Sequence, residues 1–146
     1  MIKEFNRLLQ GTYQDYNGIT YTHLEQGRAA GELSIGPKHL NPNGAVHGAV
    51  LVALADSVAM AGCVYSYDLL PATTTSLAIS YIRAVRSGKI TAEATCLSRG
   101  RTVSAWQVEC KDDEERLLAV VQINFALIKP GSTVWEKQIK GEEGTE

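Results

Sequence analysis

The stretch HGAVLVALADSVAMAG, residues 47–62, decides the fold of this chain. Alanine and leucine are abundant in it, and both residues favour a helix. Apolar side chains occupy nearly every face, and Asp56 is its only charged residue. A helix that is apolar all round is buried all round, and this one is shorter than the ~20 residues that a bilayer span needs. Another part of the protein must therefore wrap it.

The segments predicted to wrap this helix are strands, because apolar residues recur in them at every second position. They cover about residues 19–25, 28–35, 75–83, 89–97, 102–110 and 117–127. The last three are joined by short turns and predict an antiparallel meander. Residues 2–10 favour a short helix, and residues 36–44 favour a loop because proline, asparagine and glycine are frequent there. The pattern predicts an α+β fold with one central helix.

A sheet of this length cannot cover the central helix on all sides. Part of the helix must meet another surface, and a second copy of the chain is the simplest partner, so we expect a dimer. One domain is predicted over residues 15–128. Residues 1–14 are expected to form an N-terminal helix or arm, and residues 129–146 a partly disordered tail.

The composition excludes several classes of protein. The chain has 146 residues, of which 45% are hydrophobic, so it carries enough apolar surface to fold. A net charge of −2 argues against a basic domain that binds nucleic acid. Cys63, Cys96 and Cys110 are odd in number and widely spaced, which is typical of a reducing compartment. With no signal peptide at the N-terminus, we expect a cytoplasmic protein that does not enter membranes.

Asp56 is the first candidate for chemistry, because a lone carboxylate is costly to bury in an apolar helix. It could be a general base or a nucleophile, or it could cap a neighbouring segment or face a solvent gap. The loop of residues 43–48 is the second candidate, because it presents free backbone N–H groups at the positive end of the helix dipole. Such an end can hold an anion or a developing oxyanion, or its glycines merely let the loop turn.

Metal and phosphate sites are less well supported. His47 is a hydrogen-bonding positioner at such a place more often than a metal ligand, so we expect no metal and no cofactor. The basic residues Arg83, Arg86, Lys89, Arg99 and Arg101 could bind a phosphate-bearing ligand, or they could lie in solvated turns. The turns at 86–88 and 99–101 lie at opposite ends of one strand, on the order of 30 Å apart, so one ligand cannot easily reach both within one subunit.

The sequence NPNGAVHGAVLVALAD of residues 41–56 resembles the HGG-containing signature of the PaaI-type acyl-CoA thioesterases, which belong to the 4-hydroxybenzoyl-CoA thioesterase-like superfamily. TTSLAISYIR of residues 74–83 and GRT of residues 100–102 fit the same pattern. The resemblance implies a hotdog fold, in which a curved antiparallel sheet of about six strands wraps one central helix and pairs with a second copy through an edge strand. It also implies an enzyme that hydrolyses acyl-CoA or aryl-CoA to the free acid and CoA.

The resemblance further implies a role for each matching residue. Asp56 falls at the catalytic carboxylate, and Gly48 at the residue whose backbone N–H polarises the thioester carbonyl. Asn41 matches a loop asparagine that orients that group, His47 supports the loop, and Thr74 positions the attacking water.

The substrate-binding residues are less closely specified by the resemblance. Ala49 replaces the second glycine of the HGG motif, and its methyl group is expected to narrow the thioester channel. Arg83, Arg99 and Arg101 are candidates to bind the phosphates of CoA. CoA itself would arrive as part of the substrate.

Helix geometry adds a constraint on the two main candidates. Gly48 and Asp56 are eight residues apart, hence about 12 Å along a helix axis. A carbonyl held at Gly48 is therefore out of reach of Asp56 in the same chain. We expect a composite site in a homodimer, which could pair further into a dimer of dimers. The alternatives are an acyl-CoA-binding protein without activity and a hotdog hydratase or dehydratase.

Overall fold

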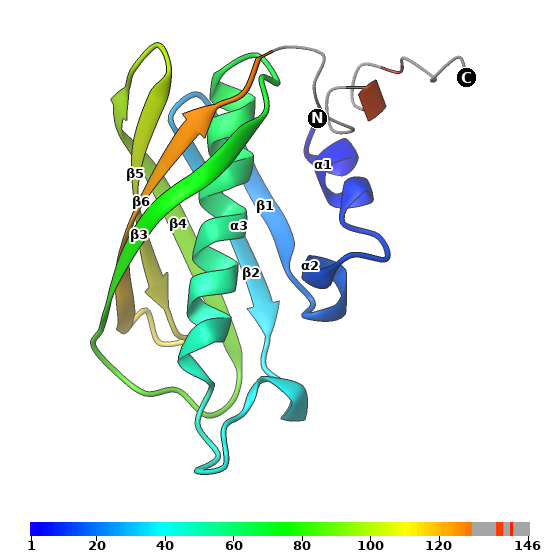
Figure 1. Cartoon of the computed structure of the whole chain (residues 1–146). Helices are drawn as coiled ribbons and strands as arrows, with labels where there is room; N and C mark the ends of the chain where they lie inside the picture. The colour runs from blue at the N-terminus through cyan, green and yellow to red at the C-terminus, as the bar shows by residue number, and fades with distance from the viewer. Residues whose placement is uncertain (130–136, 139–140, 142–146) are drawn as a thin grey trace.

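In the computed structural model, which describes residues 1–129, 137–138 and 141, an antiparallel sheet wraps one long helix (Figure 1). The elements in chain order are α1 (Ile2–Leu8), α2 (Tyr13–Tyr16), β1 (Thr20–Glu25), β2 (Arg28–Ser34), the 3₁₀ helix η1 (Pro37–His39), α3 (Gly48–Ser66), β3 (Ala72–Tyr81), β4 (Lys89–Arg99), β5 (Val103–Lys111) and β6 (Leu117–Leu127). The predicted α+β fold with one central helix is confirmed. Most of the tail expected at residues 129–146 lies outside the described residues.

The strand order in the sheet is β1-β2-β4-β5-β6-β3, and all neighbours are antiparallel. The predicted meander of the last three strands is therefore confirmed as β4, β5 and β6. Strand β3 follows α3 in the sequence but crosses to the far side of the sheet, where it pairs with β6. Its other side has no neighbouring strand within the described chain, so β3 forms an edge of the sheet.

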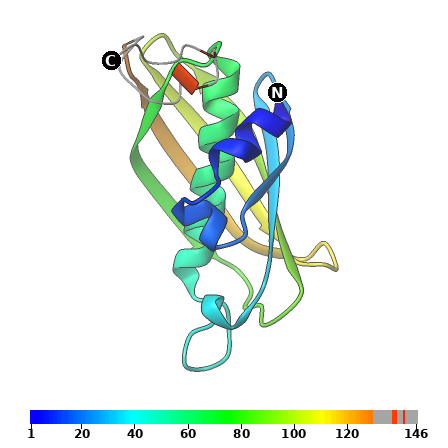
Figure 2. The same ribbon diagram turned by 90° about the vertical axis from the view of Figure 1, so that its right-hand side faces the viewer.

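The other edge, strand β1, is covered by the N-terminal segment. The side-chain amide of Asn6 donates to the backbone oxygen of Tyr21 and accepts its N–H, at 2.9 and 2.8 Å. The ring of Phe5 is fully buried and packs edge-on against the Tyr21 ring. Helices α1 and α2 thus lie beside β1 and α3 (Figure 2). Covering an edge strand in this way blocks unwanted pairing.

Helix α3 begins and ends where its flanking residues allow. At its N-terminus, His47 has an extended backbone and caps the helix with its side chain. After its C-terminus, Asp68 and Leu69 have positive φ angles, which a helix cannot continue through. Close approach to the sheet requires Gly62, because a Cβ there would lie 2.9 Å from both Trp106 and Ala29. The helix can therefore pack directly on the concave face of the sheet.

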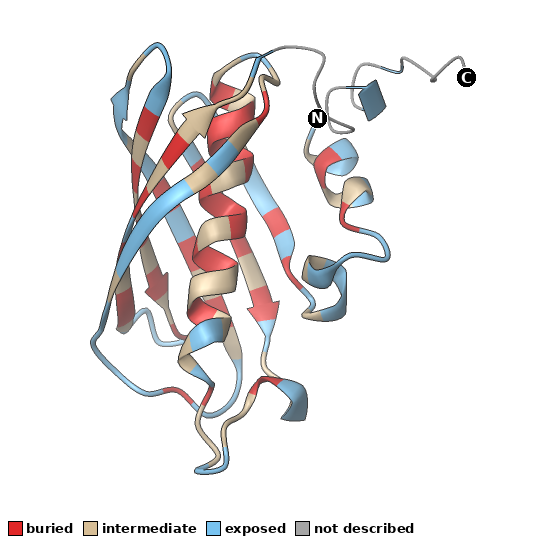
Figure 3. Cartoon of the chain, viewed as in Figure 1, coloured by how far each residue is buried: buried red, intermediate tan, exposed pale blue. Residues whose placement is uncertain are grey.

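The prediction that α3 is buried on every side holds only in part. Leu54 and Val58 are fully buried, whereas Val52, Asp56 and Met60 are only half-buried. Figure 3 shows such half-buried residues recurring along α3, and exposed residues along β3. This stripe of α3 is the part that the sheet of one chain covers least.

One expectation about hydropathy needs correction. By length and composition α3 could cross a membrane, since it has 19 residues and a mean hydropathy of 1.7. The segment read from the sequence ends at Gly62 and is too short for a span, but α3 continues to Ser66. In this structure the sheet wraps α3, and a buried core helix meets the same criteria of length and hydropathy.

Candidate active site

The loop before α3 is held in shape by its own backbone and by Asn41. The side-chain oxygen of Asn41 accepts the backbone N–H groups of Asn43 and Ala45, at 3.0 and 3.2 Å. Gly44 takes a positive φ of 76°, which favours glycine. Arg86 donates to the carbonyl of Asn43 at 2.7 Å and ties the loop to the segment before β4. The structure thus places Asn41 as the organiser of this loop, next to the start of α3.

The first three N–H groups of α3 differ in their partners. His47 accepts two of them, from Ala49 to its ring nitrogen Nδ1 at 3.0 Å and from Val50 to its carbonyl at 2.9 Å. Gly48 N–H has no acceptor in the part of the chain that the structure describes. A helix N-terminus carries a partial positive charge. Gly48 N–H is therefore available to bind a partly negative oxygen.

Tyr81 lies directly over Gly48, although the two residues are far apart in the sequence. An ideal Cβ on Gly48 would lie 2.7 Å from the Tyr81 hydroxyl oxygen and 2.8 Å from ring atom Cζ. Such distances are too short for a real contact, so a side chain at position 48 would force the Tyr81 ring to move. Sequence reasoning missed this contact, because no local pattern connects the end of β3 with the start of α3.

Asp56 lies two turns further along α3 and is paired with Thr74. The Thr74 hydroxyl donates to carboxylate oxygen Oδ1 at 2.6 Å, the length of a charge-assisted O–H···O⁻ bond. Both residues are half-buried. The structure therefore brings together Asp56 and Thr74, two of the residues singled out from the sequence. The hydrogen bond from the Thr74 hydroxyl orients the Asp56 carboxylate.

An irregularity in β3 makes this pairing possible. Thr74 and Tyr81 are seven residues apart, so a regular strand would point them to opposite faces. The register of β3 against β6 shifts between Thr74 and Ser76. A bulge of this kind adds one residue and reverses the alternation. Both Thr74 and Tyr81 consequently contact α3, one near Asp56 and one at Gly48.

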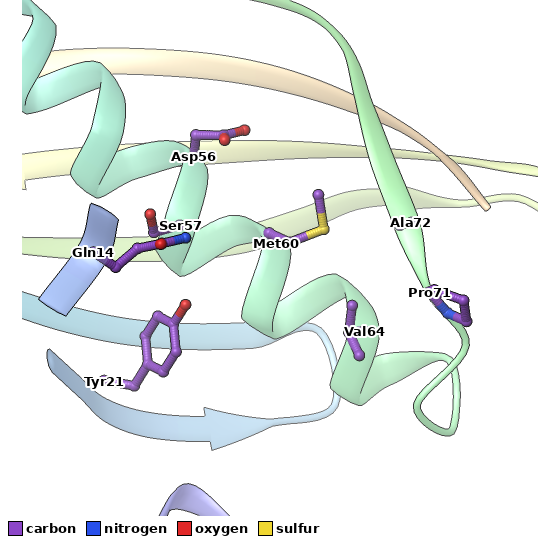
Figure 4. Close-up of a pocket in the computed structure, with 8 residues that line it drawn as sticks. All are labelled: Gln14, Tyr21, Asp56, Ser57, Met60, Val64, Pro71 and Ala72. Carbon is purple, nitrogen blue, oxygen red and sulfur yellow. The ribbon is translucent and has the colours of Figure 1, made fainter. Parts of the chain in front are cut away.

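A pocket of about 240 Å³ opens beside Asp56, between α3, α2, β1 and the start of β3 (Figure 4). Its residues include Met60, Val64 and Pro71 on the apolar side. The polar lining consists of Asp56, Gln14, Tyr21 and Ser57. The pocket can receive a compact, mostly apolar group attached to an atom near the carboxylate.

Tyr21 is the most deeply buried polar group of this pocket, with 3% of its surface exposed. Burial, with a smaller contribution from the Asp56 carboxylate, raises the pKa of its phenol. The phenol stays neutral near pH 7 and is available as a hydrogen-bond donor. Sequence reasoning missed Tyr21, which reads as an ordinary apolar strand residue.

The candidate phosphate-binding arginines are divided between the two ends of α3. Arg83 is exposed and follows Tyr81, near the start of the helix. Arg99 stacks over the Tyr67 ring at 4.8 Å, and Tyr67 donates to the Gly100 carbonyl at 2.6 Å, so Arg99 and Arg101 lie near the helix end. The turns at 86–88 and 99–101 flank the two ends of β4, as the sequence predicts. Ala49 is exposed at the start of α3 and does not line the pocket.

Other reactive groups of the described chain do not form a second site. Burial raises the pKa of the Cys63 thiol to about 11 and that of Cys110 to about 12. His39 is buried, accepts the Gly36 N–H at 2.9 Å and lies 3.0 Å from the Asn17 carbonyl, so it joins loop segments. Among the described residues no group of three or more histidine, cysteine or acidic side chains is placed to hold a metal ion.

Solved structures identify the class to which this architecture belongs. A thioesterase from Haemophilus influenzae superposes with a TM-score of 0.83 at 23% identity, covering 92% of this chain and 94% of that one. The PaaI protein of Escherichia coli superposes with a TM-score of 0.80 at 19% identity, covering 87% and 92%. At such identities the likeness establishes the fold, which is the hotdog fold expected from the sequence.

Sequence relatives and a family model then identify the family. The proofreading thioesterase EntH of Klebsiella pneumoniae is 28% identical over 124 residues, covering 84% of this chain and 90% of that protein. The 1,4-dihydroxy-2-naphthoyl-CoA hydrolase of Listeria monocytogenes is 27% identical over 119 residues, covering 80% and 95%. The model of the thioesterase superfamily matches residues 43–119, which is more than half of the chain. The chain belongs to the thioesterase superfamily and is a thioester hydrolase.

Proposed function

We propose that the protein hydrolyses acyl-CoA thioesters at a site shared between two subunits, with Asp56 from one subunit and Gly48 N–H from the other. The observation that carries this proposal is the arrangement on α3. A free N–H at the start of the helix and a carboxylate oriented by Thr74 lie on one helix, about 12 Å apart. At that separation the two groups cannot act on one thioester carbonyl within a single subunit.

Two features of the surface support the shared site. The half-buried stripe of α3 includes Val52, which is midway between Gly48 and Asp56. The neighbouring strand β3 has no strand on its outer side within the described chain, and it exposes the large apolar side chains of Leu77 and Tyr81, followed by that of Ile82. Exposed apolar surface of this kind marks an interaction site. A twofold axis near Val52 would run two copies of α3 antiparallel and bring Asp56 of each copy to Gly48 of the other.

The proposed chemistry follows from the polarity of these groups. Gly48 N–H polarises the thioester carbonyl, and Asp56 takes a proton from a water molecule as the water oxygen attacks the carbonyl carbon. The tetrahedral intermediate carries its negative charge on the oxygen held at Gly48. Its collapse breaks the carbon–sulfur bond, CoA leaves as the thiol after receiving the proton from Asp56, and the free acid remains.

The substrate groups have matching places. The acyl group enters the pocket between Tyr21 and Met60, which opens beside Asp56. In the shared site, Arg83 comes from the subunit of Gly48, while Arg99 and Arg101 come from the subunit of Asp56. Arginines from the two subunits would therefore flank one CoA molecule.

The test is CoA release from a panel of alkyl and aryl acyl-CoA esters, followed with a thiol reagent. The wild-type protein should turn over at least one of them, and Asp56→Asn should lose about 10²–10⁴-fold in kcat, the usual contribution of acid–base catalysis. A single turnover in ¹⁸O water should label the free acid and leave Asp56 unlabelled. Label in Asp56 would make it a nucleophile, and binding of the esters without any hydrolysis would contradict the proposed activity.

A further inference from the structure

The position of Tyr81 gives the site a second polar group beside Gly48. The hydroxyl end of its ring lies on the glycine, 2.7 Å from where a Cβ would be. Nitrogen and Cβ on one Cα are about 2.5 Å apart, so the Tyr81 hydroxyl oxygen lies within about 5 Å of the Gly48 nitrogen. The described chain offers this hydroxyl no hydrogen-bond partner, and 54% of the residue's surface is exposed.

Two donors at this separation can converge on one acceptor. Hydrogen bonds from N–H and O–H donors span about 2.7–3.0 Å, so an oxygen atom between Gly48 and Tyr81 can accept from both. The backbone of Tyr81 is held by pairing with Ala119, and the next residue donates to the Leu118 carbonyl at 2.8 Å. The ring is therefore attached to a fixed strand end and placed at the start of a fixed helix.

We propose that the Tyr81 hydroxyl is the second donor of the oxyanion hole, bonding the same thioester oxygen as Gly48 N–H. The assignment rests on the proposed function, since it concerns the oxygen that Gly48 polarises. It accounts for a glycine at position 48, because any side chain there would push the ring away. Both donors belong to one subunit, whereas Asp56 belongs to the other.

The hydroxyl, and not the ring, is the functional part in this assignment. A ring that only shielded the site would be replaced without loss by phenylalanine. An oxyanion donor acts more strongly on the transition state than on the bound ester, because the oxygen gains its charge only as water attacks. Loss of the donor should therefore reduce kcat and leave KM nearly unchanged.

The experiment compares Tyr81→Phe with the matched control Tyr13→Phe, whose exposed ring is on α2 and does not line the pocket. We expect kcat of Tyr81→Phe to fall roughly 10- to 100-fold, less than the loss of a fully buried oxyanion donor. KM and the affinity for a ketone analogue, in which a methylene replaces the thioester sulfur, should change less than about threefold. The control should match the wild type, and melting temperatures should show that all variants are folded.

A second comparison tests the contact with Gly48. In a Gly48→Ala background the new Cβ displaces the ring, so a further Tyr81→Phe change should cost less than about twofold, and the two effects should not add. A Tyr81→Phe variant with at least half the wild-type kcat, or with a loss confined to KM, would overturn the assignment. If Asp56→Asn is inactive in the same assay, the proposed function survives that result. If no thioester is hydrolysed by the wild type, both fall.

Discussion

Replacing Thr74 with valine removes the hydrogen bond to Asp56 while nearly preserving side-chain volume. The bond is 2.6 Å long and charge-assisted, and hydrogen bonds to charged groups are worth about 1.5–3 kcal/mol. Asp56 is half-buried, so water replaces part of the lost interaction. We therefore take about 1.5 kcal/mol, the low end, which is roughly tenfold in kcat. KM should hardly change, because Thr74 orients the carboxylate and does not bind the ester.

Steady-state release of CoA from the best ester of the panel measures this effect. Thr74→Ser keeps the hydroxyl and should remain close to the wild type. Thr75→Val is the positional control, since the Thr75 hydroxyl donates to the Asn124 carbonyl at 3.1 Å, at an exposed position. The reasoning is refuted if Thr74→Val keeps more than half of the wild-type kcat. It is also refuted if Thr75→Val is the more damaging change, because the water- and carboxylate-positioning role would then belong to that residue.

Three further predictions concern the assembly and the buried thiols. Mixing inactive Asp56→Asn and Gly48→Pro subunits should restore some activity, because one of the two shared sites in each mixed dimer is intact. The proline also displaces Tyr81, but only in the site that already lacks the Gly48 N–H. Mixed dimers verified by mass yet inactive would rule out the shared site. Leu77→Arg should shift the protein to monomers in sedimentation, since it places like charges near the twofold axis, and an unchanged dimer would contradict pairing at β3. Cys63 and Cys110 should resist iodoacetamide at pH 8 until the protein unfolds. The pKa values of the two thiols are about 11 and 12 in the folded protein, against about 8.5 in the unfolded chain. The free energy of unfolding should therefore fall as pH rises from about 9 to 12. Replacing both cysteines with alanine should make that fall shallower.

Local patterns in the sequence were sufficient to predict most of the elements. Alternating apolar residues predicted the strands, because a strand with one face on a core repeats every two residues. An alanine-rich and leucine-rich segment with a single charge, Asp56, predicted the buried helix. The surplus of apolar surface on that helix indicated a second copy of the chain. The motif around His47 and Gly48 suggested the family, which the family model confirmed.

The contacts that complete the site depended on the tertiary structure. Asp56 meets Thr74 across 18 residues of sequence, and that pairing needs the bulge in β3, which reverses the alternation that a period of two predicts. Tyr81 reaches Gly48 only because β3 crosses to the far edge of the sheet and ends beside the start of α3. Periodicity reports which face of an element is apolar, but it carries no information about which distant side chains meet. Those meetings are set by the packing of the helix on the sheet, and so the fold class follows from the sequence while the geometry of the site follows from the folded chain.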